Sequence, residues 1–166
     1  MNKILLIAIA MGVGIGSAQA AQDADDASSI ERGRYLVTIG GCNDCHTAGY
    51  AERGGQVPES EWLTGVPVGF RGPWGTSYPS NLRLVATRMS EAQFLARARS
   101  NLLPPMPWFN LVAMSDEDLK SVYRFIASLG PAGVDQPPYV APGALPETPF
   151  IEFVPTESVS AKVSAN

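Results

Sequence analysis

The segment from Gly40 to Tyr50, GGCNDCHTAGY, restricts the folding of this chain more than any other. It contains both cysteines and the single histidine of the 166-residue sequence. Cys42, Cys45 and His46 have no counterparts elsewhere in the chain. Any site that needs thiol or imidazole groups must therefore be built around this short segment.

The pattern Cys42-Asn43-Asp44-Cys45-His46 reads Cys-x-x-Cys-His, which is the signature of covalent c-type haem attachment. Two cysteines at this spacing reach the two vinyl groups of one porphyrin, and the histidine that follows becomes an axial ligand of the iron. We expect one haem c, bound through Cys42 and Cys45 with His46 on the iron. Such a cofactor also supplies apolar core material, which a small helical chain otherwise lacks.

Three other interpretations of the cysteine pair remain open but are less favoured. A thioredoxin-like redox pair is typical of a βαβ context, which the sequence does not predict. A zinc site needs four ligands, and the sequence has no further cysteine or histidine. A structural disulfide across so short a loop gains little chain entropy.

The first 20 residues resemble an export signal. Lys3 gives a positive start, residues 4 to 15 are largely apolar, and Ala18-Gln19-Ala20 is an A-x-A cleavage site. An apolar run of about a dozen residues is short of the roughly 20 that span a bilayer. We expect a signal peptide at 1–20, a disordered leader at 21–28, a periplasmic location, and no integral membrane segment after cleavage. The net charge of −4 argues against general nucleic-acid binding.

Helix signals occur in three places. Ser28 or Ser29 can cap a helix that ends at Gly40-Gly41, Ser90 can cap one over Glu91 to Arg99, and Ser115 can cap one that stops at Gly130. Residues 47 to 81 are rich in glycine and proline and predict a long loop region, and the run NLLPPMPWFN opposes helix formation. The expected fold class is all-α, a small helical domain with long loops wrapped around a haem.

With one histidine in the chain, the sixth position of the iron is left for a methionine or a water, or it stays open. Met89 and Met114 each precede a helix cap, which explains both without a ligand role. Met106 lies in the run Pro104 to Trp108, where prolines restrict the backbone and hold the sulfur in place. We expect His46 and Met106 as the axial pair, which raises the reduction potential.

The segments ERGRYLVTIGGCNDCHT, GPWGTSYPSNL and PPMPWFNLVAMSDEDLKSVYRFIASLG resemble class I c-type cytochromes, in particular the bacterial monohaem cytochromes and cytochrome subunits that accompany periplasmic dehydrogenases. The resemblance implies a cytochrome c domain over 29–130. It also implies crossed terminal helices, with Gly33 at the close approach and Tyr123 as its aromatic partner. The proximal histidine of the family donates to a proline carbonyl, for which Pro58 is the candidate.

Hydrogen-bond donors to the haem propionates are expected from the loop region 47 to 81. The candidates are Arg71, Trp74, Tyr78 and Asn81. Packing against the core is the alternative for the two aromatic residues.

These observations predict a single-electron carrier that is not itself an enzyme and that exchanges electrons with a dehydrogenase or oxidase. The alternative is a fixed cytochrome subunit of a dehydrogenase or respiratory complex, with the Pro-rich extension at 131–166 docked on a partner. A haem peroxidase or gas sensor with an open distal side is less favoured, because the chain has no second histidine.

Overall fold

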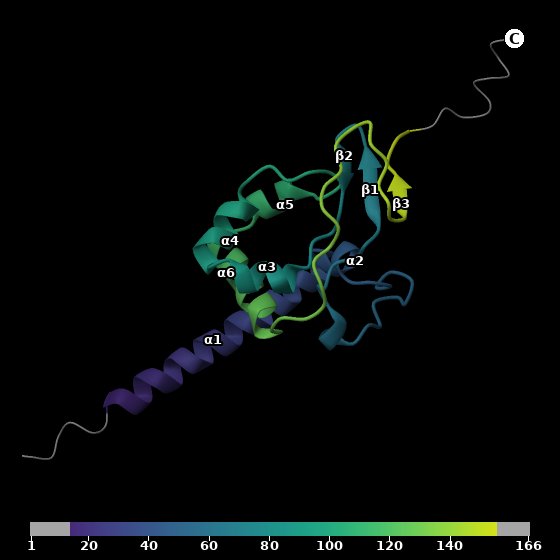
Figure 1. Ribbon diagram of the computed structural model, residues 1–166. Helices are drawn as coiled ribbons and strands as arrows, with labels where there is room; N and C mark the ends of the chain where they lie inside the picture. Colours follow the sequence, from purple (N-terminus) through teal and green to yellow (C-terminus); the bar gives the residue numbers. More distant parts are fainter. Residues whose placement is uncertain (1–13, 156–166) are drawn as a thin grey trace, which may run out of the picture.

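The computed structural model describes residues 14 to 155. It is mostly helical, with a small sheet at one end (Figure 1). The elements in chain order are α1 Gly14–Ile39, α2 Cys42–His46, the 3-10 turn η1 Glu59–Glu61, β1 Gly69–Gly72, β2 Gly75–Ser77, α3 Leu82–Arg88, α4 Glu91–Ala98, α5 Trp108–Ala113, α6 Asp116–Ser128 and β3 Phe150–Glu152.

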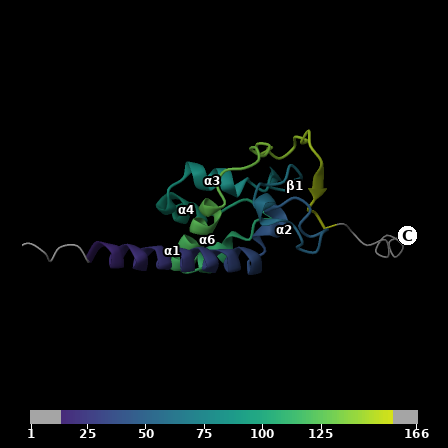
Figure 2. The ribbon, with the colours of Figure 1, turned by 90° about the horizontal axis from the view of Figure 1, so that it is seen from below.

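The core forms where α1 packs on α6. Figure 2 shows α1 running along one side of the domain beneath α6. Val37 of α1 and Phe125 and Ile126 of α6 are almost completely buried. Each such side chain contributes about 1.5–3 kcal/mol relative to an exposed one. This helix pair holds the start of the cysteine motif, because α2 begins just after α1 ends.

Gly33 lets the two helices approach closely. A Cβ atom at this position would lie 1.9 Å from the backbone oxygen of Ser121 and 2.8 Å from the Cβ of Phe125. The expected role of Gly33 is therefore confirmed. Tyr123 is not its aromatic neighbour: the Tyr123 ring packs on Phe94 with centroids 5.5 Å apart, and its hydroxyl donates to the Met89 carbonyl. Phe125 takes that place.

The helix caps follow the sequence signals. Ser90 caps α4 in a capping box with Gln93, and the Ser115 hydroxyl accepts from the backbone N–H of Asp118 at the start of α6. Both caps satisfy backbone donors that the first turn leaves free. The stop of the first helix before Gly40-Gly41 is also confirmed, since α1 ends at Ile39.

The expectation of an all-α fold is wrong in one part, the region 47 to 81. β1 and β2 form an antiparallel hairpin there, with Phe70 opposite Ser77 and Gly72 opposite Gly75. β3, from the Pro-rich extension, adds to β1 in parallel and gives the order β2-β1-β3. The chain is mostly helical with a three-stranded sheet.

Two helices lie where the sequence predicts none. Asn81 caps α3 by accepting from the Leu84 backbone N–H, which makes residues 82 to 88 helical. α5 begins at Trp108, directly after Pro107, because the prolines oppose helix only up to that point.

The first helix also differs from its expected start. It begins before Ser28 and covers residues 21 to 28, and most of the expected signal peptide at 1–20 lies outside the described residues. The domain bounds stay predictions.

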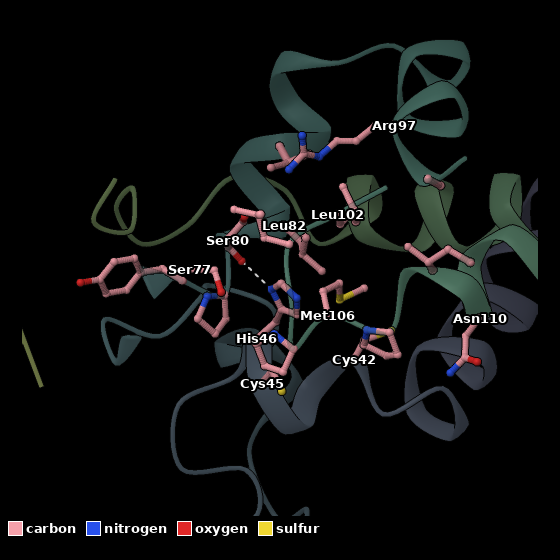
Figure 3. Close-up of a pocket in the computed structure, with 18 of the residues that line it drawn as sticks. Cys42, Cys45, His46, Ser77, Ser80, Leu82, Arg97, Leu102, Met106 and Asn110 are labelled. Carbon is pink, nitrogen blue, oxygen red and sulfur yellow. Dashed lines mark hydrogen bonds between the residues drawn. The ribbon is translucent and has the colours of Figure 1, made fainter. Parts of the chain in front are cut away.

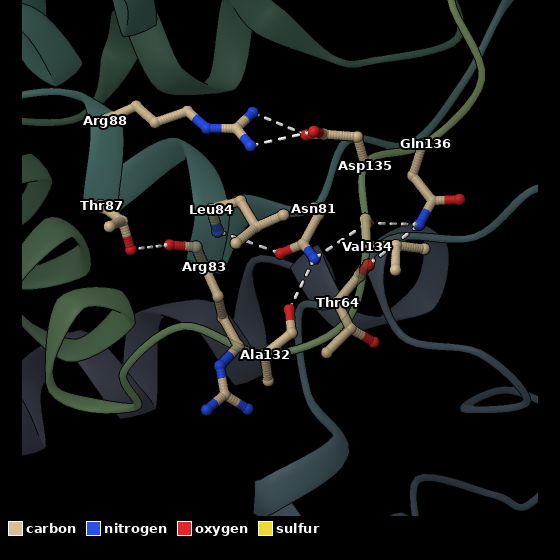
Figure 4. Close-up of polar contacts among 10 residues, drawn as sticks. All are labelled: Thr64, Asn81, Arg83, Leu84, Thr87, Arg88, Ala132, Val134, Asp135 and Gln136. Atoms are coloured by element: carbon tan, nitrogen blue, oxygen red, sulfur yellow. Dashed lines mark hydrogen bonds and ion pairs between the residues drawn. The ribbon is translucent and has the colours of Figure 1, made fainter.

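The C-terminal extension folds back over the domain. The Asn81 amide donates to the carbonyls of Ala132 and Val134, at 2.7 and 3.1 Å, and Gln136 donates to the Thr64 carbonyl at 3.1 Å (Figure 4). Beyond these contacts, Val140 exchanges two backbone hydrogen bonds with Thr76, at 2.8 and 3.0 Å. The extension is thus part of the domain up to β3.

Among residues 14 to 155, no helix combines the length and apolar character that a membrane crossing requires.

Candidate functional site

A cavity of about 520 Å³ lies between α2, α3, α4, α5 and α6 and the loop that carries Met106. Its walls are mostly apolar. The larger apolar side chains on them include Phe70, Leu82, Phe94, Leu102, Leu111 and Ile126. A cavity of this size and character suits a cofactor with a large apolar body.

The cysteine motif forms one wall. Cys42 and Cys45 are three residues apart in the helix α2, so both lie on one face, and both line the cavity. Gly41 precedes the helix in the left-handed conformation, with φ 66°, which lets the chain turn sharply out of α1. Thr47 holds the end of α2: its hydroxyl donates to Asn43 and accepts from the Leu63 backbone N–H.

His46 points into the same cavity with one ring nitrogen already bonded (Figure 3). Its Nδ1 lies 2.7 Å from the Ser80 carbonyl oxygen. A carbonyl only accepts, so Nδ1 carries the proton. Burial lowers the pKa of His46, although the Ser80 hydrogen bond raises it in part. The neutral ring therefore keeps an unprotonated Nε2, which is the form that binds a metal.

The prediction that the Pro58 carbonyl accepts the ring proton of His46 is wrong. Pro58 precedes the turn η1 and its carbonyl accepts from the Glu61 backbone N–H. Ser80, the residue after Pro79, supplies the carbonyl instead. The loop from 47 to 81 returns to the histidine only at its far end, so the sequence distance from His46 did not identify the acceptor.

The two thiols are unlike a redox-active pair. Desolvation raises the pKa of Cys42 to about 11, and desolvation together with the Asp44 charge raises the pKa of Cys45. Reactive cysteines have lowered pKa values, because the thiolate is the nucleophile. Both cysteines are free thiols, and the described part of the chain holds no group of three His, Cys, Asp or Glu side chains suited to a metal ion.

Met106 lines the same cavity as His46, and Figure 3 draws both side chains. Its segment has little helical structure, and its backbone N–H donates to the Leu103 carbonyl at 3.2 Å. Met114 lines the cavity as well, whereas Met89 is not among the lining residues. Two thioethers are thus available to this cavity, and Met106 is the one held between prolines.

The four residues expected to bind propionates have protein partners instead. Arg71 pairs with Glu152, and the Trp74 ring N–H donates to the Phe70 carbonyl. The Tyr78 hydroxyl shares a hydrogen bond with Thr148, although Tyr78 also lines the cavity. Asn81 caps α3 and holds the extension. These residues organise the hairpin and the C-terminal extension.

Several residues of the cavity wall were not expected from the sequence, among them Pro137, Tyr139 and Arg97. Pro137 and Tyr139 reach the wall from the C-terminal extension, and the Tyr139 hydroxyl donates to the Trp74 carbonyl at 2.7 Å. Arg97 reaches it from α4. No local pattern marks the first two. The only signal for Arg97 is a basic residue in a helix whose Phe94 points inward.

Two thiols, a neutral imidazole with a free Nε2 and the methionine side chains of Met106 and Met114 face one apolar cavity. This donor set fits a haem attached by two thioethers and bound axially by histidine and methionine.

Comparison with known proteins gives relatives that belong to dehydrogenases. The chain is 28% identical over 131 residues to the gluconate 2-dehydrogenase cytochrome c subunit of Pantoea cypripedii, covering 72% of this chain and 27% of the relative. It is 28% identical over 134 residues to the cytochrome c subunit of the quinone alcohol dehydrogenase of Gluconacetobacter polyoxogenes, covering 74% and 26%. A nicotinate dehydrogenase chain of Pseudomonas putida matches at 25% over 124 residues, covering 67% and 9%.

No family model matches the chain, and no solved structure matches it significantly. The chain spans about a quarter of the length of the gluconate and alcohol dehydrogenase subunits. It is therefore similar to part of these cytochrome c subunits. The similarity supports a c-type cytochrome with an electron-transfer role.

Proposed function

We propose that this chain is an exported c-type cytochrome that binds one haem and passes single electrons from a dehydrogenase of which it is a subunit. The observation that carries the proposal is the cavity into which Cys42, Cys45, His46 and Met106 all project. The similarity to dehydrogenase cytochrome c subunits supports the subunit role.

The protein side of this function is binding and positioning. Cys42 and Cys45, which both line the cavity, would hold the haem through thioether bonds to its two vinyl groups. His46 presents Nε2 because Ser80 holds the proton on Nδ1. A haem bound here supplies a one-electron change at iron. The apolar walls would keep water from the haem, and ligation by His46 and Met106 would raise its reduction potential.

Met106→Ala tests the axial assignment. We expect the variant to lose the methionine-to-iron charge-transfer band. We also expect its reduction potential to fall by on the order of 0.1 V or more, since axial ligands set haem potentials over about 0.8 V. A visible spectrum with a redox titration measures both.

Met89→Ala is the matched control, because Met89 does not line the cavity, and it should match wild type. An unchanged Met106→Ala protein together with an altered Met114→Ala protein would move the ligand to Met114. Fast cyanide or carbon monoxide binding by native protein would instead indicate an open iron site.

The subunit role has its own test. Tagged protein purified from its native cells should carry a dehydrogenase in fixed ratio, and its haem should become reduced when the substrate of that dehydrogenase is added. Gluconate, an alcohol and nicotinate form the first panel, because the relatives belong to dehydrogenases of those names. If the haem protein purifies alone and stays oxidised with every substrate, the subunit role is wrong and the free-carrier interpretation is favoured.

A further inference from the structure

Arg97 differs from every other arginine that the structure describes. Seven of them form ion pairs with carboxylates, namely Arg32, Arg34, Arg53, Arg71, Arg88, Arg99 and Arg124. Arg83 donates to the backbone carbonyls of Ser60, Leu129 and Gly130. The Arg97 guanidinium has no hydrogen-bond or ion-pair partner among residues 14 to 155.

The position of Arg97 in the cavity makes this difference informative. Arg97 lines the cavity from the last turn of α4, and no other lysine, arginine, aspartate or glutamate in the described part of the chain does so. In Figure 3 its side chain lies at the end of the cavity away from Cys42 and Cys45. The apolar wall around it offers no anion to balance its charge.

The chemistry of the cofactor identifies an anion for this position. A porphyrin joined through its vinyl groups to Cys42 and Cys45 presents its two propionates on the opposite edge. The planar guanidinium fork matches a carboxylate with two parallel hydrogen bonds, and such charge-assisted bonds are the stronger kind. We propose that Arg97 binds the haem propionates and positions that edge of the cofactor, an inference that rests on the proposed function.

The four donors expected from the sequence strengthen this assignment. Arg71 is neutralised by Glu152, and Asn81 uses its amide on α3 and the extension. Trp74 and Tyr78 are bonded within the sheet region. Arg97 is the cation on the wall that remains available.

Arg97 then affects the reduction potential. Its positive charge, and its hold on a negative propionate, favour the reduced iron, which carries one positive charge less than the oxidised iron. Removing the cation favours the oxidised state. Without the cation, a propionate is protonated up to a higher pH. The pH range over which the reduction potential falls should therefore also be higher.

The other charged and titratable groups around this region are accounted for. On the cavity wall they are His46, Cys42, Cys45, Tyr78 and Tyr139. On α4, its C-terminal end and α6, the ion pairs are Glu91–Arg124, Arg99–Asp116, Lys120–Glu117 and Asp118–Arg32. Those ion pairs are complete without Arg97, and the Arg97 variants below leave them intact.

The test compares holoproteins of Arg97→Gln, Arg97→Lys and Lys120→Gln with wild type. Lys120→Gln removes the same charge from an exposed pair on α6. We expect Arg97→Gln to shift the one-electron equilibrium toward the oxidised form by about three- to tenfold, where tenfold equals about 59 mV. The pH interval over which its reduction potential falls should lie higher than in wild type. Arg97→Lys should keep most of the wild-type potential, and Lys120→Gln should match wild type.

Each outcome is decisive. An Arg97→Gln protein with the potential and pH profile of wild type overturns the role of Arg97, and so does an equal shift in Lys120→Gln. If Arg97→Gln yields no holoprotein, Arg97→Lys is used for the test instead. Lysine lacks the planar fork, so the pH dependence of the reduction potential should shift in the same direction as expected for Arg97→Gln, but by a smaller amount. Wild-type protein without covalent haem overturns the proposed function itself, which the spectrum detects before any variant is compared.

Discussion

Replacing Cys42 and Cys45 together by serine should abolish covalent haem attachment. Both thiols line the cavity from one face of α2, and no other cysteine exists to replace them. A serine hydroxyl does not add to a vinyl group as a thiol does. The double variant should therefore release all of its haem into acidified organic solvent and lose haem staining on a denaturing gel. Each single variant should keep one thioether.

Asp44→Asn is the matched control, since Asp44 lies between the two cysteines and its side chain is exposed. It should retain the haem through both bonds, as judged by the haem absorbance in alkaline pyridine, which differs for zero, one and two thioethers. Covalent haem that persists in the double serine variant would refute attachment at this motif.

Gly33→Ala should destabilise the domain severely, even though the same change usually strengthens a helix. Alanine in a helix interior is favoured over glycine by about 1 kcal/mol. Here the added Cβ would lie 1.9 Å from the Ser121 backbone oxygen, so α1 must move away from α6. We expect a net loss of about 3 kcal/mol or more, because overpacking at a helix crossing disturbs the buried core. The melting temperature should fall by about 10 °C or more.

Glu31→Ala provides the comparison, because Glu31 is exposed on the same helix. Its unfolding free energy should change by no more than about 0.5 kcal/mol. Thermal unfolding of both holoproteins, followed by circular dichroism, measures the difference. A Gly33→Ala protein as stable as wild type would mean that the two helices do not cross as closely as the structure shows.

The cysteine motif could be identified from sequence because its chemistry is local. Cys42, Cys45 and His46 lie in one short helix, and their spacing alone brings them to one cavity. The hydrogen-bond acceptor of His46 could not be identified in the same way. Ser80 reaches the ring only because the loop folds back, and loop paths depend on contacts far apart in the chain.

The elements of the fold could likewise be predicted only where their sequence signal is local. Ser90 and Ser115 indicate where helices begin, because their own side chains form the caps, and both caps form as expected. The hairpin of β1 and β2 has little alternation of polar and apolar residues. β3 forms only because Phe150 and Ile151 find β1 across most of the chain. Such long-range pairing leaves no local signal.

The C-terminal extension also decides when the cavity can exist. Pro137 and Tyr139 complete its wall, and α6 supplies Ile126 only shortly before them in the chain. Synthesis runs from the N-terminus. A chain that ends before α6 therefore lacks part of the wall that faces Cys42, Cys45 and His46. The cavity is complete only once the residues up to Tyr139 are in place.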